Sequence, residues 1–382
     1  MDLWIPRWQT LSLLVLGLLL LNGALNAWAR PRLHQFRPRT RGPKVSLLLP
    51  ARNEARSIAR CVHSLANQTY RPLEILVLDD QSTDATPQVL AALKQRYPHI
   101  RILQGQPLPL GWTGKNWACH QLAQYATGDI LLFVDADTWL ASDTVARVVA
   151  AMEETGAHVL SGLPFQVMAT WAERLSIPFL RFGTQGLLPT WVTRWLALPA
   201  FALAVGQFLA FQRGAYEALG GHAAVREHVV EDMALARRAV GAGYRVVFMD
   251  IRALVRARMY GTWPEIREGF LKSLWLVIGR SGLGYLLGWL LLWSVFVLPW
   301  IGLSLVGFLD ASIPGFDVRR AWTNILLAMM HWGLYAREHP RHWEPILLHP
   351  IIVTVFTYLA LLSYYRHKRG LAVMWKERWI HI

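Results

Sequence analysis

Acidic residues come in pairs at two places where an apolar run ends. Asp79 and Asp80 follow one run, and Asp135 and Asp137 follow the other. Carboxylates gathered at one edge of a sheet repel each other unless a positive charge lies between them, and a divalent metal carrying a diphosphate meets that need. Mg²⁺ and Mn²⁺ prefer oxygen ligands, commonly one or two carboxylates together with phosphate oxygens. A lone Asp at a strand end more often caps a turn or a helix, but the second pair weakens that alternative.

One lysine is placed to meet such a diphosphate. Lys115 lies in the segment GWTGKNW, residues 111–117, just before an apparent helix. A lysine there, together with the free amides of the helix N-terminus, can neutralise a diphosphate. The alternative is an ordinary solvated loop lysine. Trp112 and Trp117 of the same segment either wall the site or belong to the core.

Short apolar runs alternate with helical patterns through the middle of the chain. We predict strands at 45–49, 74–80, 100–103 and 129–137, and helices at 54–65 and 114–126. This alternation predicts an α/β fold with a mostly parallel sheet, whose ligands bind at the carboxyl ends of its strands. Both aspartate pairs would then lie at one edge.

Other segments are apolar enough to enter a membrane, in a chain with 54% hydrophobic and 17% charged residues. Residues 11–29 carry no charge and are followed by a basic cluster, which favours an anchor over a cleaved signal peptide and keeps the following domain in the cytoplasm. We predict spans at 283–309 and 345–365 and a re-entrant or interfacial segment at 321–335. The basic tail after 365 then lies inside. The expected domains are an anchor and linker (1–43), a cytoplasmic domain (44–275) and a C-terminal membrane region (276–382).

The charge and the cysteines exclude other classes. The net charge of +14 permits nucleic-acid binding, but many of the basic residues flank apolar segments, as they do in cytoplasmic membrane loops. We therefore expect no nucleic-acid partner. Cys61 and Cys119 lack metal-type spacing, and two free thiols fit a reducing compartment.

Four motifs in order resemble the inverting family 2 glycosyltransferases with the GT-A fold. They are PARNE at 50–54, DDQSTD at 79–84, DAD at 135–137 and GGH…ED at 220–232. GWTGKNWACHQ at 111–121, the segment at 258–275 and the tail at 349–379 resemble a narrower group of polytopic enzymes that glycosylate carotenoids and carotenoid acids, with relatives acting on hopanoids and ceramides. The tail, around Trp375-Lys376-Glu377-Arg378, departs from that group at Glu377, where glycine is expected.

This resemblance implies a role for each candidate residue. Asp137 would bind Mn²⁺ or Mg²⁺, and Asp135 the ribose or the outer shell of the metal. Asp232 would be the catalytic base, although a helix cap is its ordinary alternative. Asp80 is the preferred partner for the uracil N–H. The remaining candidates are Pro50, Ala51, Glu54, Asp79 and Lys115 for the nucleotide-sugar, and Gly206, Gln207 and Glu231 for the sugar or acceptor pocket.

The function expected from these features is transfer of one sugar, by default glucose from UDP-glucose, to a membrane lipid such as a carotenoid, with inversion. The expected partners are the nucleotide-sugar, the lipid acceptor and the cell membrane. The Gln-x-x-Arg-Trp motif of processive polysaccharide synthases is missing, which disfavours a polymer-making enzyme. A non-catalytic nucleotide-sugar-binding protein is the alternative from another class, and the intact aspartates argue against it. A transporter would carry charges inside its spans, which these segments lack.

Overall fold

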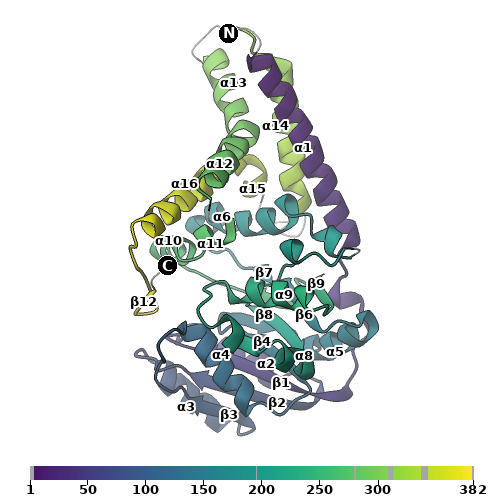
Figure 1. Cartoon of the computed structure of the whole chain (residues 1–382), viewed down its shortest axis with the longest axis vertical. Helices are drawn as coiled ribbons and strands as arrows, with labels where there is room; N and C mark the ends of the chain where they lie inside the picture. The colour runs from purple at the N-terminus through teal and green to yellow at the C-terminus, as the bar shows by residue number, and fades with distance from the viewer. Residues whose placement is uncertain (1–3, 195, 279–280, 309–312, 337–342, 381–382) are drawn as a thin grey trace. The chain divides into compact units, whose positions relative to one another are not determined.

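The computed structural model describes residues 4–194, 196–278, 281–308, 313–336 and 343–380, which form two compact units (Figure 1). The α/β unit comprises Arg30–Val167 and Val192–Met259, and the helical unit comprises Met1–Ala29, Met168–Trp191 and Tyr260–Ile382. The units interleave along the chain, so they do not follow the sequential boundaries at residues 43 and 275.

A seven-stranded sheet in the order β3-β2-β1-β4-β8-β6-β9 forms the centre of the α/β unit. Its strands are β1 (Arg41–Ala51), β2 (Arg71–Asp79), β3 (Ile100–Gln104), β4 (Ile130–Val134), β6 (Val159–Leu163), β8 (Phe208–Gln212) and β9 (Val246–Asp250). All neighbours are parallel except β8, which runs antiparallel to both β4 and β6. The predicted mostly parallel α/β fold is therefore confirmed.

The central strands are apolar on both faces because helices cover both. On β1, Leu47 and Leu49 belong to one buried cluster, with side chains of α2 (Ile58–Ala66), α3 (Thr86–Arg96) and α5 (Thr144–Thr155). Leu48 belongs to a second cluster, with side chains of α4 (Gly114–Tyr125) and α9 (Glu231–Gly241). Successive side chains of a strand point to opposite faces, so a run such as 45–49 fills both cores.

Two predicted boundaries shift for local reasons. The helix predicted from residue 54 begins at Ile58, because the Glu54 carbonyl accepts the backbone N–H groups of Ser57 and Ile58 in a turn. The strand predicted over 129–137 ends at Val134, and a turn then leads to β5 (Thr138–Leu140). A separate three-stranded sheet joins β5, β10 (Val255–Ala257) and β7 (Phe165–Gln166).

The helical unit contains ten α-helices in the described part of the chain. They are α1 (Trp4–Ala29), α6 (Trp171–Ser176), α7 (Pro178–Arg181), α10 (Trp263–Leu271), α11 (Leu274–Ile278), α12 (Gly282–Phe296), α13 (Leu298–Phe308), α14 (Val318–Ala336), α15 (Glu344–Leu347) and α16 (His349–Lys368). By length and composition, α1 can cross a membrane, and α12 with α13 can do so as one span bent by 45°. The last residue of the predicted span 283–309 lies outside the described residues.

The tail forms a hairpin of β11 (Val373–Trp375) and β12 (Arg378–Ile380). The two residues between the strands, Lys376 and Glu377, have φ of 47° and 60°. A two-residue hairpin turn with positive φ at both positions favours glycine. The positive φ at position 377 therefore explains why the resemblance predicts glycine there. This chain forms the same turn with glutamate at that position.

Candidate active site

The carboxyl ends of β1 and β2 place the first group of candidate residues side by side. Ala51 pairs with Asp79, and Pro50 pairs with Leu78, in parallel register. The Asp80 N–H donates to the Ala51 carbonyl over 2.7 Å. Both aspartates are buried, and one Asp79 oxygen accepts the Ser82 N–H at 3.1 Å. Asp79 therefore shapes the turn after its strand.

The loops that follow these two strands are tied together. The Asn53 N–H donates to the Ser82 hydroxyl at 3.0 Å, and the Thr83 N–H donates to the Asn53 amide oxygen at 2.8 Å. The Glu54 N–H donates to the Thr86 hydroxyl at 2.8 Å, and its carboxylate accepts the Ser57 hydroxyl at 2.7 Å. These bonds hold the segment after β1 in place beside Asp80.

An ion-paired cluster lies at the end of β4. The Lys115 ammonium is 2.9 Å from each carboxylate oxygen of Asp135 and 3.0 Å from a Glu231 oxygen. Although burial lowers the pKa of Lys115, the charges of Asp135 and Glu231 raise it well above its ordinary value. Burial in turn raises the pKa of Asp135, while Lys115 opposes that shift. Lys115 is thus a cation held between two acids, one from the turn after β4 and one from α9.

The first turn of α4 holds Lys115 in this position. The Thr113 side chain caps the helix by accepting the Asn116 N–H. The buried Asn116 side chain donates to the carbonyls of Val225, Arg226 and His228 at 2.8, 3.1 and 3.0 Å. Because these three residues come shortly before α9, one asparagine fixes the start of α4 against the segment that leads to Glu231.

Asp232 lies beside Gly206 at the start of α9. Its two carboxylate oxygens accept the Gly206 N–H at 2.6 Å and the Met233 N–H at 2.7 Å. A Cβ added to Gly206 would come within 2.8 Å of the Lys115 ammonium, 3.1 Å of Glu231 and 3.3 Å of Asp232. A side chain at position 206 would therefore displace the Lys115 ammonium from its present position.

The protonation of Asp232 follows from its surroundings. Burial, and then the charge of Glu231, raise the pKa of Asp232 from 3.8 to about 7. Glu231 behaves differently, since Lys115 outweighs burial and lowers its pKa. Two adjacent carboxylates therefore have separated pKa values, a pattern typical of acid–base assignments.

Asp137 belongs to a chain of amides that the sequence did not reveal. The Gln207 amide N–H₂ lies 3.3 Å from both Asp137 oxygens, and the Gln207 oxygen accepts from the Gln166 amide at 2.8 Å. Gln166 is buried on the short strand β7. A two-residue strand leaves no periodicity to read, so no sequence signal identified Gln166.

The other motif residues support the site from within the core. His222, from the GGH motif, bonds the Tyr216 hydroxyl at 2.8 Å, and burial lowers its pKa to about 3. Gly220 and Gly221 have φ of 78° and 51°, values that favour glycine. Burial raises the pKa of the two thiols, Cys61 and Cys119. These are neutral packing groups.

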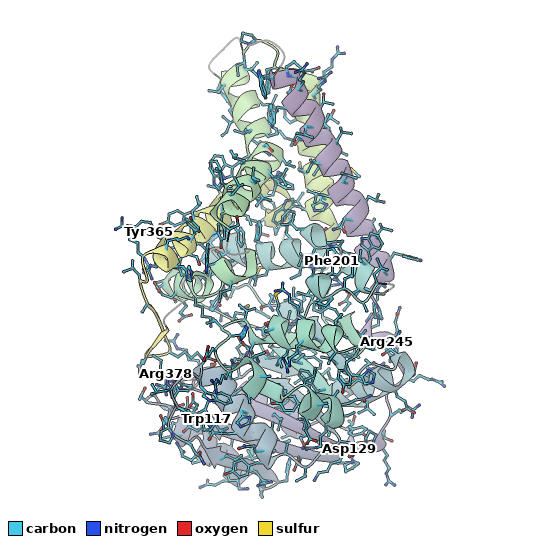
Figure 2. All side chains as sticks on the ribbon, in the orientation of Figure 1. Trp117, Asp129, Phe201, Arg245, Tyr365 and Arg378 are labelled. Atoms are coloured by element: carbon cyan, nitrogen blue, oxygen red, sulfur yellow. The ribbon has the colours of Figure 1, made fainter. Side chains whose placement is uncertain are left out.

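Trp112 and Trp117 pack against each other and against His120. Their ring centroids are 5.0 Å apart, and the Trp117 indole N–H donates to the Gln106 carbonyl at 3.1 Å. Trp117 is labelled in Figure 2. Both tryptophans are half-buried. They form an aromatic cluster on the helix that carries Lys115.

The donor set at the end of β4 fits a divalent metal shared with a substrate. Asp135 and Asp137 present hard oxygen ligands from one turn. Among the described residues no group of three His, Cys, Asp or Glu side chains can hold a metal alone. In Mg²⁺ and Mn²⁺ sites, one or two carboxylates are commonly completed by phosphate oxygens and water.

Comparison with known proteins extends this geometry. Residues 130–337 match Glycosyl transferase family group 2, and residues 46–204 match Glycosyl transferase family 2. A 4,4'-diaponeurosporenoate glycosyltransferase of Staphylococcus aureus (strain MRSA252) is 25% identical over 96% of this chain and 97% of its own length. A beta-monoglucosyldiacylglycerol synthase of Nostoc sp. is 36% identical over 38% of this chain, and the match spans only 32% of that protein.

One solved structure shares the fold over almost the whole chain. A mannosyltransferase from Pyrobaculum calidifontis, in complex with GDP-Man and Mn²⁺, superposes with a TM-score of 0.56 at 18% identity, covering 95% of this chain and 98% of its own.

Proposed function

This chain belongs to the family 2 glycosyltransferases, and on that premise we propose that it transfers one sugar from a nucleotide-sugar to a membrane lipid, with inversion. The observation that carries the proposal is the cluster at the sheet edge, where Lys115, Asp135 and Glu231 are in contact and Asp232 adjoins them through Gly206. It combines a cation for a diphosphate with a carboxylate of raised pKa.

The acceptor is a long apolar molecule with one reactive oxygen. Two relatives with different acceptors support this, since one is a diaponeurosporenoate glycosyltransferase and the other a glucosyldiacylglycerol synthase. Of these, the carotenoid-acid enzyme aligns with nearly the whole chain, so a carotenoid or carotenoid acid is the preferred acceptor. The preferred donor is UDP-glucose.

The donor would lie along the carboxyl ends of β1, β2 and β4. Asp80 would accept the uracil imide N–H, with Pro50, Ala51, Glu54 and Asp79 shaping the pocket around the nucleoside. Lys115 would then turn its ammonium from the carboxylates to the diphosphate, where the free amides at the start of α4 add to it. Donor binding would thus replace the carboxylates of Asp135 and Glu231 by the diphosphate as the anionic partners of Lys115, and the ammonium would stay paired.

Asp232 would act as the base in the transfer step. The acceptor oxygen attacks the anomeric carbon from the face opposite the diphosphate, so a new carbon–oxygen bond forms while the bond to the phosphate oxygen breaks. The electron pair leaves with the nucleoside diphosphate, and the acceptor proton passes to Asp232. A pKa near 7 makes this carboxylate a stronger base than an ordinary aspartate while leaving it substantially ionised at neutral pH.

Asp137 and Asp135 would hold the divalent cation. When bound, Mn²⁺ or Mg²⁺ offsets the charge that develops on the leaving diphosphate. Gln166 and Gln207 would orient Asp137, because the amide chain fixes which side of Gln207 faces the carboxylate.

We place the protein at the cell membrane with the α/β unit and the tail in the cytoplasm. Supporting this are the apolar helix α1, whose residues 8–29 carry no charge, and the basic residues that follow it.

The proposal is tested by incubating membranes that contain the protein with radiolabelled UDP-glucose and extracting the lipid. Label should appear in a carotenoid glycoside only with the active protein, and Asp137→Ala is the inactive control for both hydroxyl and carboxylic acid acceptors. Label that stays entirely in the aqueous phase with every nucleotide-sugar and lipid extract tried would contradict lipid transfer. Lipid analysis of a deletion strain then identifies the acceptor.

A further inference from the structure

The buried faces of helices α1 and α14 carry polar side chains among small and apolar ones, whereas their exposed faces carry several large apolar side chains. On α1 the buried positions include Gln9, Ser12 and Asn26, whereas Leu11, Leu14, Leu18 and Leu21 are exposed. On α14, Asn324 and His331 are buried, whereas Trp322, Leu326 and Met330 are exposed. A helix in water shows the reverse pattern.

The buried polar groups of the two helices bond each other. The Gln9 side chain donates to the Asp317 carbonyl and accepts the Asp317 N–H, both at 2.9 Å. The Asn324 amide donates to the Ser12 hydroxyl at 2.5 Å. Lipid-exposed helices associate through such hydrogen bonds and through small residues that allow close contact.

Contacts farther along show that α1 and α14 run in the same direction (Figure 1). Gln9 lies beside the start of α14, and Gly23 lies where an added Cβ would come within 2.6 Å of the Tyr335 hydroxyl near its end. The 19 residues of α14, at 1.5 Å per residue, extend about 28 Å, close to the ~30 Å of a bilayer core. Where α1 crosses, α14 crosses beside it.

The helix α16 differs, because both its ends are paired with helices that flank the α/β unit along the chain. Near its start, Glu344 of α15 binds Arg174 of α6 at 2.8 Å, and at its end Arg366 binds Glu268 of α10 at 3.2 Å. Val167 and Met259 are the residues at which the chain passes from the α/β unit into the helical unit. Arg174 comes shortly after the first of them, and Glu268 shortly after the second.

Contacts with α12 and α13 limit how deep α16 reaches. Its first residue, His349, accepts the Trp300 indole N–H at 3.3 Å, and Thr357 accepts from Trp293 at 3.1 Å. Ser363 bonds the Leu271 carbonyl at 2.8 Å. The helix thus runs back along α12 only from the bend between α12 and α13, and its exposed side carries residues such as Tyr365 (Figure 2).

From these contacts we infer that α14 is a third membrane crossing and that α16 lies in the cytoplasmic half of the bilayer. The chain crosses outward-to-inward in α1, inward-to-outward in α12 with α13, and outward-to-inward in α14, with acyl chains on the exposed leucine faces. This replaces the sequence-based scheme, in which 321–335 stays interfacial and 345–365 spans. The inference concerns the membrane attachment proposed above, and its failure would leave the transfer reaction standing.

Single cysteines with a membrane-impermeant maleimide separate the two schemes. The natural Cys61 and Cys119 are buried, and the protein without an added cysteine measures their background. Trp343→Cys and Arg369→Cys place exposed probes at the two ends of α15–α16. Arg369→Cys should react in inverted vesicles, and neither probe should react in right-side-out ones.

Cysteines at two further exposed positions serve as references for the two sides of the membrane. Gln95→Cys, on α3, reports the cytoplasm, and Pro314→Cys, ahead of α14, should react only from the outside. Retained sugar transfer shows that each variant is folded. Trp343→Cys that reacts from the outside overturns the inference. So does Pro314→Cys that reacts from the inside.

Discussion

Replacing Asp232 by Asn tests the chemistry of the site most directly. Asn keeps the size of the side chain but cannot take a proton, so turnover should fall by roughly 10² to 10⁴. Donor binding should change little, because the nucleotide and metal contacts are assigned to other residues. The assay is the initial rate of lipid glycosylation with a hydroxyl acceptor, together with UDP affinity from calorimetry. A carboxylic acid acceptor is unsuitable, since it is already ionised and hardly needs a base.

The structure also sets the effect of this substitution on stability. Both Asp232 oxygens accept a backbone N–H, from Gly206 and Met233. Asn offers only one acceptor, and losing a hydrogen bond to a charged group costs about 1.5 to 3 kcal/mol. Against this, Asn removes a carboxylate that is costly to ionise. The rise in pKa from 3.8 to about 7 corresponds to about 4 kcal/mol at most, and solvent screening of this partly exposed side chain makes it smaller.

The lost hydrogen bond and the cost of ionising Asp232 can be distinguished by measuring stability as a function of pH. Because the folded state raises the pKa of Asp232, the stability from its proton is full below pH 3.8 and is lost as the pH rises through about 7. Wild type should therefore lose stability relative to Asp232→Asn between pH 5 and pH 8, by on the order of 1 to 3 kcal/mol. Wild-type kcat/KM should fall about tenfold per unit below pH 7, because the base becomes protonated.

The control for Asp232 is another acid at a helix start. Asp143 is the N-cap residue of α5 and pairs with Arg147 at 2.7 Å, so Asp143→Asn should leave turnover unchanged. A folded Asp232→Asn protein that binds the donor and turns over at a rate near wild type would refute the base assignment. Glu231 or the acceptor itself would then have to supply the base.

Three further perturbations address the neighbouring groups. Lys115→Met should raise the KM for the donor at least tenfold and weaken UDP binding in calorimetry, and unchanged UDP affinity would show that the ammonium stays with Asp135. Chelation with EDTA should abolish transfer, and added Mn²⁺ or Mg²⁺ should restore it. In a titration followed by electron paramagnetic resonance, Mn²⁺ should bind the Asp137→Ala protein weakly even with UDP present. Full turnover in the chelator would contradict a metal site. Gly206→Ala should cut turnover more than tenfold while the protein stays folded, because its Cβ would come within 2.8 Å of the Lys115 ammonium; the matched control is Gly214→Ala, where a Cβ meets nothing within 4 Å.

The sheet edge could be predicted from the sequence because each signal is local. Apolar runs that end in Asp79 or Asp135 specify a strand and its polar end together, and parallel pairing then brings the ends to one edge. The contact of Lys115 with Glu231 is different, because it depends on Asn116 holding α4 against the segment before α9. Those residues are far apart in sequence, and a single sequence carries no sign of their pairing.

Gln166 shows the same limit at the scale of one strand. It reaches Asp137 through Gln207, and the two glutamines come from β7 and from the residue before β8. The sheet order places β8 between β4 and β6 although it follows β6 in the chain. Because this insertion is antiparallel, it brings the start of β8 to the carboxyl end of β4, a position that alternating strands and helices alone do not predict.

The membrane helices could not be ranked by hydropathy because an average over a helix mixes its two faces. Asn324 and His331 lower the mean of α14, yet both are buried against other helices, while Leu326 and Met330 on the other face are exposed. Its start was also missed, since the Asp317 carboxylate accepts the Arg319 N–H at 2.8 Å and extends the helix ahead of residue 321. In contrast, α16 is similar in length but is ion-paired near both ends to helices adjoining the α/β unit in sequence. On the topology proposed above, the partners of a helix decide whether it crosses, and its mean hydropathy alone does not.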